Sequence, residues 1–426
     1  MTDSIFALSS GAPPAGIGVI RISGPSAGSA LLALAGALPT PRRARLSSLT
    51  DPRDGALLDR ALILWFPGPS TVTGEDLAEL HCHGGRAVIA AIEDALGTLP
   101  GLRRAQAGEF TRRAFANGRM DLNAVEGLSD LLAAETQQQR RAALLMAEGH
   151  FSRRVEGWRH SLLDLSAMTE AALDFSDEDD VPDEGIEARI GQGIRTLAHD
   201  VEAVLAAPSA ERLRDGVRVV LAGPPNAGKS TLLNHLVGRE AAIVSDIAGT
   251  TRDRIEVPAA LGGVAFLFTD TAGLRAETSD AIEAIGMERA RGALDAADII
   301  LWLGPAEELP RADAIMVAAQ CDRGADDRPG LRLSALTGEG MQALIAILLD
   351  RAARLLPGEG DYALHRRQRD AAALLHGHLA LASGSGDLLI VAEELRQARN
   401  AIDQLTGRAS TEDMLDHLFS GFCIGK

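Results

Sequence analysis

Cysteine is scarce in this chain, whose 426 residues include only Cys82, Cys321 and Cys423. An odd number of cysteines spread this widely does not make a disulfide framework, which excludes the class of small disulfide-stapled secreted domains. Free thiols are typical of a reducing compartment, so we expect a cytoplasmic protein.

Long hydrophobic runs are missing as well. No stretch of about 18 apolar residues is available to span a bilayer, and the N-terminal Met-Thr-Asp-Ser-Ile-Phe is not a basic leader followed by an apolar segment. We therefore expect neither export nor membrane insertion.

Positive charge is not in excess, because 42 Lys and Arg residues stand against 59 Asp and Glu, a net charge of −17. A chain this acidic does not wrap nucleic acid nonspecifically, and contact with RNA would require a local basic patch or a partner protein. The pairs at 42–43 and 112–113 are more simply interpreted as solvated surface charge. With 46% apolar and 24% charged residues, the chain has the composition of a globular protein of two or three domains.

Residues 223–230, Gly-Pro-Pro-Asn-Ala-Gly-Lys-Ser, form a complete G-x-x-x-x-G-K-S phosphate loop. The loop follows the strand-like run 217–222 and precedes the helix-like run 231–236. Its glycines let backbone N–H groups converge on phosphates, Lys229 supplies a positive charge, and the Ser230 hydroxyl is placed for Mg²⁺. We expect a nucleoside triphosphate here, since a glycine-rich turn opening an ordinary helix explains this context poorly.

The residue pattern predicts a multidomain chain of the α/β and α classes. Residues 1–117 mix strand-like runs with glycine and proline turns, a pattern that predicts an α+β domain. Helical spacing dominates 118–213 and again 356–426, and we expect these two segments to pack as one helical domain. Residues 214–355 alternate strands and helices, as expected of an inserted phosphate-loop domain with a mainly parallel sheet.

Two later segments follow the order found in GTPases. Residues 246–253, Asp-Ile-Ala-Gly-Thr-Thr-Arg-Asp, provide a threonine loop that completes the Mg²⁺ shell when the γ-phosphate is present. Asp270-Thr271-Ala272-Gly273 follow the strand-like run 264–269, where the aspartate orders metal-bound water and the glycine senses the phosphate. Each motif is short, but their order and spacing together favour a GTPase.

Guanine selection is predicted to lie at Asp322, with Ser334 and Ala335 downstream. A carboxylate there can accept hydrogen bonds from both the ring N–H and the exocyclic amine of guanine, which adenine does not offer together. The usual motif is Asn-Lys-x-Asp, whereas this chain has Ala319 and Gln320 in its first two positions. We expect GTP to bind with weakened affinity, and preference for another nucleotide remains open.

The residue after the second GTPase segment is Leu274, so the glutamine that orients the attacking water in Ras-like enzymes is missing. Glu283 is the nearest carboxylate that can take this role. Its alternative interpretation is an exposed glutamate at a helix start. His81 and His83 would share one face of a strand, but two ligands without a third give little support for a metal site.

Four separated signatures make the chain resemble the MnmE (TrmE) family of tRNA-modification GTPases, within the TrmE-Era-EngA-YihA-Septin-like group. They are the phosphate loop with Asn226, the threonine loop 249–253, the Glu-x-Ile-Gly-x-Glu segment 283–288, and the terminal Phe-Cys-Ile-Gly-Lys 422–426. Segments 18–24, 66–69, 73–76 and 108–111 belong to the same pattern, so the resemblance covers nearly the whole length.

The resemblance implies a K⁺-stimulated GTPase that works with the FAD-containing partner MnmG on the wobble uridine of tRNA. Carboxymethylaminomethyl or aminomethyl addition at the fifth carbon would use a one-carbon unit from a folate such as 5-formyltetrahydrofolate. The resemblance also implies a homodimer through the N-terminal domains and a heterotetramer or larger complex with MnmG.

The resemblance further implies the roles of individual residues. K⁺, in place of an arginine finger, would be held by Asn226, Ser245, Ile247 and Thr250, and Mg²⁺ by Ser230 and Thr251. The catalytic set would be Asn226, Lys229, Thr250, Glu283 and Cys423. The GTP-binding set comprises Asn226, Ala227, Gly228, Lys229, Ser230, Thr231, Ser245, Asp246, Ile247, Ala248, Gly249, Thr250, Thr251, Asp270, Thr271, Ala272, Gly273, Asp322, Ser334 and Ala335.

Four positions match the folate site of the family: Arg21, Glu79, Arg119 and Lys426. A carboxylate can pair with the amino-pyrimidine edge of a pterin, and cations suit the folate carboxylates. Arg119 stands where a lysine is expected. Without the resemblance, these residues would be interpreted as surface or strand-edge residues. Cys423 is a candidate reactive thiol, and its alternative interpretation is a buried structural cysteine in a packed tail.

Two other functions remain open at this stage. The altered guanine motif is compatible with a nucleotide-regulated scaffold that hydrolyses GTP weakly, and the switch motifs are shared with ribosome-assembly GTPases. The folate positions and the terminal Cys-Ile-Gly-Lys argue against the latter.

Overall fold

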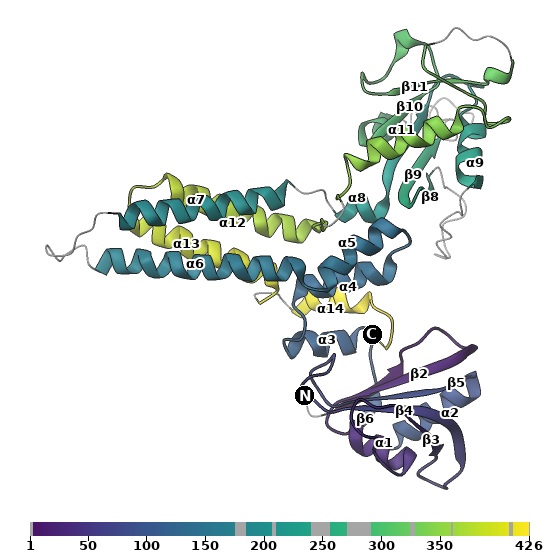
Figure 1. Ribbon diagram of the computed structural model, residues 1–426, viewed down its shortest axis with the longest axis vertical. Helices are drawn as coiled ribbons and strands as arrows, with labels where there is room; N and C mark the ends of the chain where they lie inside the picture. Colours follow the sequence, from purple (N-terminus) through teal and green to yellow (C-terminus); the bar gives the residue numbers. More distant parts are fainter. Residues whose placement is uncertain are drawn as a thin grey trace. The chain divides into compact units, whose positions relative to one another are not determined.

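The computed structural model describes residues 3–174, 185–206, 210–239, 256–270, 291–323, 329–358, 361–408 and 412–425. The chain divides into two compact units, of which the first joins Met1–Ser129 to Ile402–Lys426 and the second comprises Asp130–Ala401. Each unit has its own six-stranded sheet (Figure 1).

The sheet of the first unit has the strand order β3-β4-β5-β2-β1-β6. Its strands are β1 (Ser4–Leu8), β2 (Ala15–Ser23), β3 (Arg45–Thr50), β4 (Leu57–Phe66), β5 (Leu77–Gly84) and β6 (Leu102–Arg104). Their pairing is antiparallel except between β1 and β6. Helices α1 (Ala27–Ala35) and α2 (Arg86–Gly97) share a buried core with one sheet face, to which Ile20, Ile63 and Leu80 contribute. The expected α+β fold of this region is confirmed.

The opposite face of this sheet is less covered. Phe110 packs over Ile5 and Ala7 at the β1 end, but the register aligns Leu46, Leu62 and His81 in a cross-strand row toward the other edge. Leu46 is 70% exposed and Leu62 38% exposed. Within this unit, an apolar strip therefore remains in contact with solvent.

The C-terminal segment belongs to the first unit. It contains α14 (Glu412–Ser420), and the N-terminal segment supplies α3 (Glu109–Ala116) and α4 (Leu122–Ala133). Leu122 and Val125 of α4 form a buried cluster with Leu415, Phe419 and Phe422.

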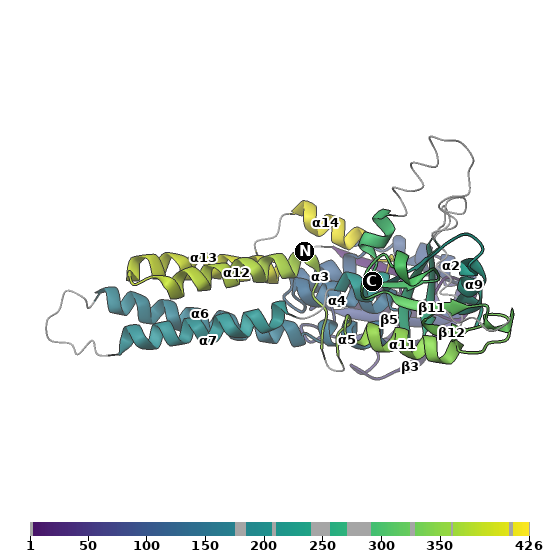
Figure 2. The same cartoon turned by 90° about the horizontal axis from the view of Figure 1, so that it is seen from above.

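Four long helices of the second unit run side by side (Figures 1 and 2). They are α6 (His150–Asp174), α7 (Ile186–Leu205), α12 (Arg366–Gly384) and α13 (Leu388–Thr406), with the shorter α5 (Gln137–Ala147) before them. Two of the long helices precede the second sheet in sequence and two follow it, so the helical part is built from two chain segments, as expected. None of the described helices combines the length and apolar character needed to cross a membrane.

The second sheet has the order β12-β11-β10-β7-β9-β8 and is parallel except for β8. Its strands are β7 (Val217–Ala222), β8 (Glu256–Leu261), β9 (Val264–Asp270), β10 (Ile299–Trp302), β11 (Ile315–Ala319) and β12 (Leu331–Leu333). Helices α8 (Ala210–Asp215), α9 (Lys229–Arg239) and α11 (Met341–Ala353), a helical stretch at 291–296 and two short 3₁₀ turns, Ala306–Glu308 and Cys321–Arg323, accompany this sheet. Because parallel strands end at the same edge, the segments after β7, β9, β11 and β12 meet there.

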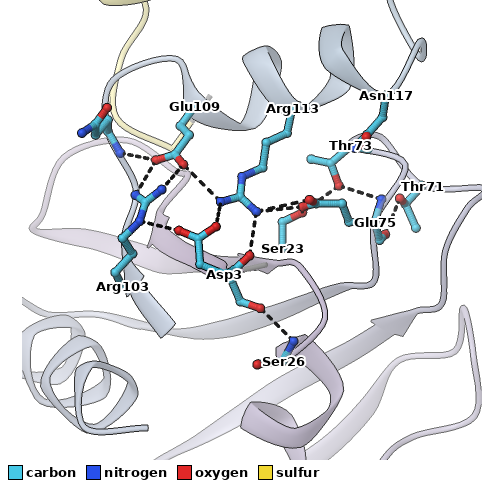
Figure 3. A network of polar contacts seen from close by, with 12 residues as sticks. Asp3, Ser23, Ser26, Thr71, Thr73, Glu75, Arg103, Glu109, Arg113 and Asn117 are labelled. Atoms are coloured by element: carbon cyan, nitrogen blue, oxygen red, sulfur yellow. Dashed lines mark hydrogen bonds and ion pairs between the residues drawn. The ribbon is translucent and has the colours of Figure 1, made fainter. Parts of the chain in front are cut away.

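A buried arginine organises the loop side of the first sheet (Figure 3). Arg113 is 0% exposed. Its Nη2 donates to Asp3 at 3.0 Å and to Glu109 at 3.2 Å, and its Nη1 donates to Glu75 at 3.2 Å. Burial raises the pKa of Glu109, but hydrogen bonds from Arg103, the Gln106 N–H and Arg113 outweigh it and hold the pKa below its ordinary value. The stabilisation from Glu109 is therefore present at neutral pH and is lost as the pH falls through this lowered pKa.

Replacing Arg113 with leucine should destabilise the first unit by about 3 kcal/mol, because the largely buried Glu75 and Glu109 carboxylates lose their shared cation. Trp65 lies in the core of this unit and reports its unfolding by fluorescence. We expect a lower urea midpoint for Arg113→Leu in a background that carries Trp158→Phe and Trp302→Phe.

The matched control is Arg112→Leu. Arg112 pairs with Glu412 and Asp416, whose side chains are 78% and 60% exposed, so its loss should cost only about 0–1 kcal/mol. Equal midpoint shifts for the two variants would contradict the role given to Arg113.

Candidate nucleotide-binding site

The phosphate loop connects β7 to α9 and depends on left-handed backbone. Gly223, Asn226 and Gly228 have φ angles of +148°, +61° and +93°. A Cβ on Gly223 would lie 3.0 Å from the Leu303 carbonyl carbon, and one on Gly228 would lie 3.2 Å from Gln320 Nε2. Glycine is therefore required at both positions, whereas asparagine tolerates the left-handed region.

Lys229 and Ser230 open α9 directly after this loop. Lys229 is 4% exposed, and its Nζ donates to the Gly223 and Pro224 carbonyls at 2.9 and 2.8 Å. The Ser230 hydroxyl donates to the Asp270 carboxylate at the end of β9. A hydroxyl and a carboxylate oxygen in contact are hard donors of the kind that Mg²⁺ prefers, either directly or through water. Parallel pairing of β7 with β9 brings these two residues together; from the sequence, each was assigned separately to the Mg²⁺ site.

A cavity of about 140 Å³ lies beside the loop, between the ends of β11 and β12. It is lined by Gly228, Thr231, Leu232, Ala319, Gln320, Asp322, Arg323, Leu333, Ser334, Ala335 and Leu336. Gly228, Thr231, Asp322, Ser334 and Ala335 had been predicted from the sequence to contact the nucleotide. Ala319 and Gln320 had been placed at the guanine motif, whereas Leu232, Arg323, Leu333 and Leu336 were not assigned to the site from the sequence.

Asp322 is held as a carboxylate in this cavity. Its hydrogen bond with the Ser334 hydroxyl holds the pKa of Asp322 below the ordinary value. Ser334 is fully buried, and its Oγ accepts hydrogen bonds from the Leu336 and Thr337 N–H groups at 3.3 and 3.2 Å. The serine therefore orients a charged acceptor toward the cavity, where it can read two adjacent N–H groups of a purine.

Gln320 makes a contact that the motif comparison did not anticipate. Its φ is +64°, and its Nε2 donates to the Asn226 carbonyl in the phosphate loop at 3.3 Å. Its Oε1 accepts from Arg323 Nη1 at 3.4 Å. This side chain thus links the segment after β11 to the phosphate loop, at the position where a lysine is usual.

Several predicted site residues lie outside the described residues. They are Ser245, Asp246, Ile247, Ala248, Gly249, Thr250 and Thr251 of the threonine loop, Thr271, Ala272 and Gly273 after Asp270, and Glu283 and Lys426. Their assignments remain predictions.

Arg21 and Glu79, two of the predicted folate residues, pair on neighbouring strands. Arg21 Nη2 donates to Glu79 Oε1 at 2.9 Å, and His81 Nε2 lies 3.1 Å from Glu79 Oε2. Burial raises the pKa of Glu79, but the hydrogen bonds from His81 and Arg21 and their charges outweigh it, so its pKa lies below the ordinary value. The carboxylate is ionised at neutral pH on the less covered sheet face.

Arg119 and Cys423 belong to the same unit. Arg119 Nε donates to the Thr71 carbonyl at 3.1 Å. Asn117 Nδ2 donates to the Thr73 carbonyl of the same loop at 2.7 Å. Cys423 is exposed, so the alternative of a buried structural cysteine is wrong for this thiol. The structure gives no contact between Arg119 and Arg21 or Glu79.

The His81-Cys82-His83 segment does not gather ligands. Cys82 is buried on the core side of β5, where burial raises the pKa of its thiol to about 11. His83 Nδ1 instead contacts Asp59 at 2.8 Å. Among the residues that the structure describes, no group of three or more His, Cys, Asp or Glu side chains is placed to hold a metal ion.

Comparison with known proteins gives two family matches that together span almost the whole chain. Residues 4–119 match the family described as GTP-binding protein TrmE N-terminus, and residues 122–423 match the MnmE helical domain.

Full-length relatives are also similar. The tRNA modification GTPase MnmE of Rhizorhabdus wittichii is 62% identical, with 100% of this chain and 97% of the relative covered. The protein of the same name from Sphingopyxis alaskensis is 58% identical, with 96% of this chain and 100% of the relative covered. Among solved structures, the G domain of the T. maritima FeoB iron transporter is 25% identical with a TM-score of 0.25, covering 32% of this chain and 98% of that domain.

Gly228→Ala should weaken binding of a fluorescent guanine nucleotide by about tenfold or more. Alanine at a φ of +93° is strained, and its methyl group would crowd Gln320. Titration by fluorescence anisotropy in the presence of Mg²⁺ measures the effect.

Gly238→Ala, later in the same helix, provides the control. A Cβ at Gly238 meets nothing within 4 Å, so this change should leave affinity unaltered and raise stability by about 0.5–1 kcal/mol. Unchanged affinity in Gly228→Ala would exclude the described loop conformation as the binding conformation.

Proposed function

The chain belongs to the MnmE family of tRNA modification GTPases, and we propose that it hydrolyses GTP in order to modify the wobble uridine of tRNA. The observation that carries this proposal is the arrangement at one sheet edge. Lys229, the Ser230–Asp270 pair and the Asp322–Ser334 pair there match the phosphate, Mg²⁺ and guanine of one bound nucleotide.

Two cations belong to the proposal. Mg²⁺ would be held by Ser230 and Thr251, and K⁺ by Asn226, Ser245, Ile247 and Thr250. Asn226 suits this role because it lies within the phosphate loop, with a φ of +61°, and its side-chain amide offers an oxygen as a ligand. A monovalent cation there would supply positive charge between the β- and γ-phosphates, where charge develops during cleavage.

Hydrolysis also requires an oriented water molecule. We assign this role to Glu283, because leucine follows the Asp-Thr-Ala-Gly segment and a nearby carboxylate can accept a hydrogen bond from the water. Lys229 contributes a fixed positive charge at the phosphates.

The modification itself would involve a folate in the first unit. The Arg21–Glu79 pair lies on a sheet face that remains partly exposed, and Glu79 is an ionised acceptor suited to the amino-pyrimidine edge of a pterin. Arg119 and Lys426 would contact the anionic or formyl groups of 5-formyltetrahydrofolate. The exposed Cys423 thiol is available as a reactive group in the same unit.

Partners follow from the same proposal. An FAD-dependent MnmG-type protein would complete the carbon transfer at the fifth position of the uridine, giving a carboxymethylaminomethyl or aminomethyl group, in the cytoplasm. The exposed apolar strip with Leu46 and Leu62 supports a homodimer through the first unit. Since the net charge is −17, contact with tRNA would depend on a local patch or on the partner.

Steady-state GTP hydrolysis should be at least tenfold faster in KCl than in NaCl at equal ionic strength, because K⁺ fits the proposed oxygen ligands and Na⁺ is smaller. Release of inorganic phosphate measures the rate, with ATP as the control substrate. Equal rates in the two salts would remove K⁺ from the mechanism, and absence of turnover with intact GTP binding would favour the scaffold alternative.

Glu283→Ala provides an internal control for catalysis. It should retain GTP affinity and lose hydrolysis by about 10²-fold or more, the range of an oriented general base. An unchanged rate would show that another group orients the water.

Glu79→Gln should weaken binding of 5-formyltetrahydrofolate by about tenfold or more, because a charged acceptor for the pterin edge becomes neutral. Isothermal titration calorimetry measures the affinity, and Trp65 fluorescence checks that the unit is folded. Asp94→Asn is the control, since Asp94 lies on α2 with its side chain 66% exposed. Affinity within twofold of the wild type for Glu79→Gln would rule out this folate site.

A further inference from the structure

The base cavity differs from the usual guanine site in the residue that ends β11. Ala319 lines the cavity and is 4% exposed. Its side chain is a methyl group, which neither donates nor accepts a hydrogen bond. The next residue, Gln320, donates a hydrogen bond from its side-chain amide nitrogen to the Asn226 carbonyl.

The strand order determines which edge of a guanine would face Ala319. Starting from β7, which leads into the phosphate loop, the neighbouring strands on this side of the sheet are β10, β11 and β12, in that order. Asp322 is tied to Ser334, which follows β12, whereas a Cβ on Gly228 of the phosphate loop would lie 3.8 Å from the Ala319 Cβ. Ala319 therefore lies on the phosphate-loop side of the cavity, and the Asp322–Ser334 pair lies on the far side.

Guanine chemistry orients the base between these two sides. Its N1–H and 2-amino group suit the Asp322 carboxylate. Its five-membered ring bears the ribose at N9, and the ribose leads to phosphates at Gly228 and Lys229. The five-membered ring, with the acceptor N7, thus faces the Ala319 side.

Several described side chains that line this cavity carry N–H or O–H groups and could in principle donate to N7. Each of them either contacts another protein group or lies toward the phosphate end. Ser334 is hydrogen-bonded to Asp322. Gln320 Nε2 directs one N–H to the Asn226 carbonyl, and Arg323 is turned toward Gln320, to whose Oε1 its Nη1 donates. Thr231 follows Ser230 in the first turn of α9, at the phosphate end.

We propose that this protein recognises guanine without a side-chain hydrogen bond to N7, and that Gln320 is a positioning residue that ties the base segment to the phosphate loop. The proposal rests on GTP being the substrate, as proposed above. Selectivity for guanine then comes from Asp322 at the N1 edge, and a GTP analogue altered only at N7 binds as well as GTP. In place of a base contact, the amide of Gln320 steadies the loop that holds Asn226.

The wild-type protein itself gives the first test. Its dissociation constants for GTP and for 7-deaza-GTP, in which a C–H replaces N7, should agree within twofold, measured by competition against a fluorescent GDP in Mg²⁺ and KCl. Inosine triphosphate, which lacks the 2-amino group, should bind at least tenfold more weakly because one hydrogen bond to the Asp322 carboxylate is lost. If 7-deaza-GTP binds fivefold or more weakly than GTP, the proposal is overturned.

Ala319→Asn provides the gain-of-contact variant. An amide at this position should tighten GTP by about 3- to 10-fold, the range of one neutral hydrogen bond, and leave 7-deaza-GTP unchanged. Equal tightening of both nucleotides would mean that the added side chain acts by packing, and that N7 does not lie beside position 319.

Variants of Gln320 separate positioning from base contact. Gln320→Glu replaces the N–H donor by a charged acceptor facing the Asn226 carbonyl and should weaken GTP and 7-deaza-GTP by the same factor, about fivefold or more. Gln320→Lys restores a donor and should recover affinity for both. If Gln320 instead reads N7, wild-type protein will discriminate against 7-deaza-GTP and Gln320→Glu will abolish that discrimination.

Failure of this inference is distinguishable from failure of the proposed function. If GTP binds no better than ATP, guanine is not the base and the proposed function fails at its first step. If GTP is preferred but 7-deaza-GTP is rejected, the GTPase function stands and only the account of the N7 edge is wrong.

Discussion

Parallel pairing of β7 with β9 and β10 is the constraint on which the nucleotide site depends. It brings Ser230, which follows the phosphate loop, against Asp270 at the end of β9. The next strands along the same edge carry Gln320 and Ser334 into position. Residues that would contact phosphate, Mg²⁺ and base are therefore ordered along one edge by strand order alone, as in other open α/β sheets.

The first unit is organised by charge instead of by a sheet edge. Fully buried Arg113 joins the N-terminus, the 71–76 loop and α3 through Asp3, Glu75 and Glu109 (Figure 3). An arginine suits this place because its planar fork can donate to several carboxylates at once. The same loop carries the Thr71 carbonyl that accepts a hydrogen bond from Arg119, so the loop that the buried arginine contacts also contacts a residue of the proposed folate site.

Much of this could be predicted from local sequence. The strand-like run 217–222 is β7 and the run 264–269 lies in β9, because apolar periodicity and turn residues act over one element. Motif reading already placed Ala319 and Gln320 at the guanine motif, but it did not assign Leu232, Arg323, Leu333 and Leu336 to the base cavity. Their place in the cavity depends on which elements are neighbours, and one sequence read by motif does not reveal that.

The sequence by itself determined the chemistry available: a phosphate loop, a carboxylate proposed to bind guanine and the signatures of the MnmE family. These features are encoded within short stretches whose backbone conformation follows from glycine, proline and residue spacing. Only the tertiary structure decided that Gln320 reaches the Asn226 carbonyl across 94 residues and that Arg113 is enclosed by three acidic residues. Contacts between distant segments depend on strand order, register and burial, which arise when the whole core packs.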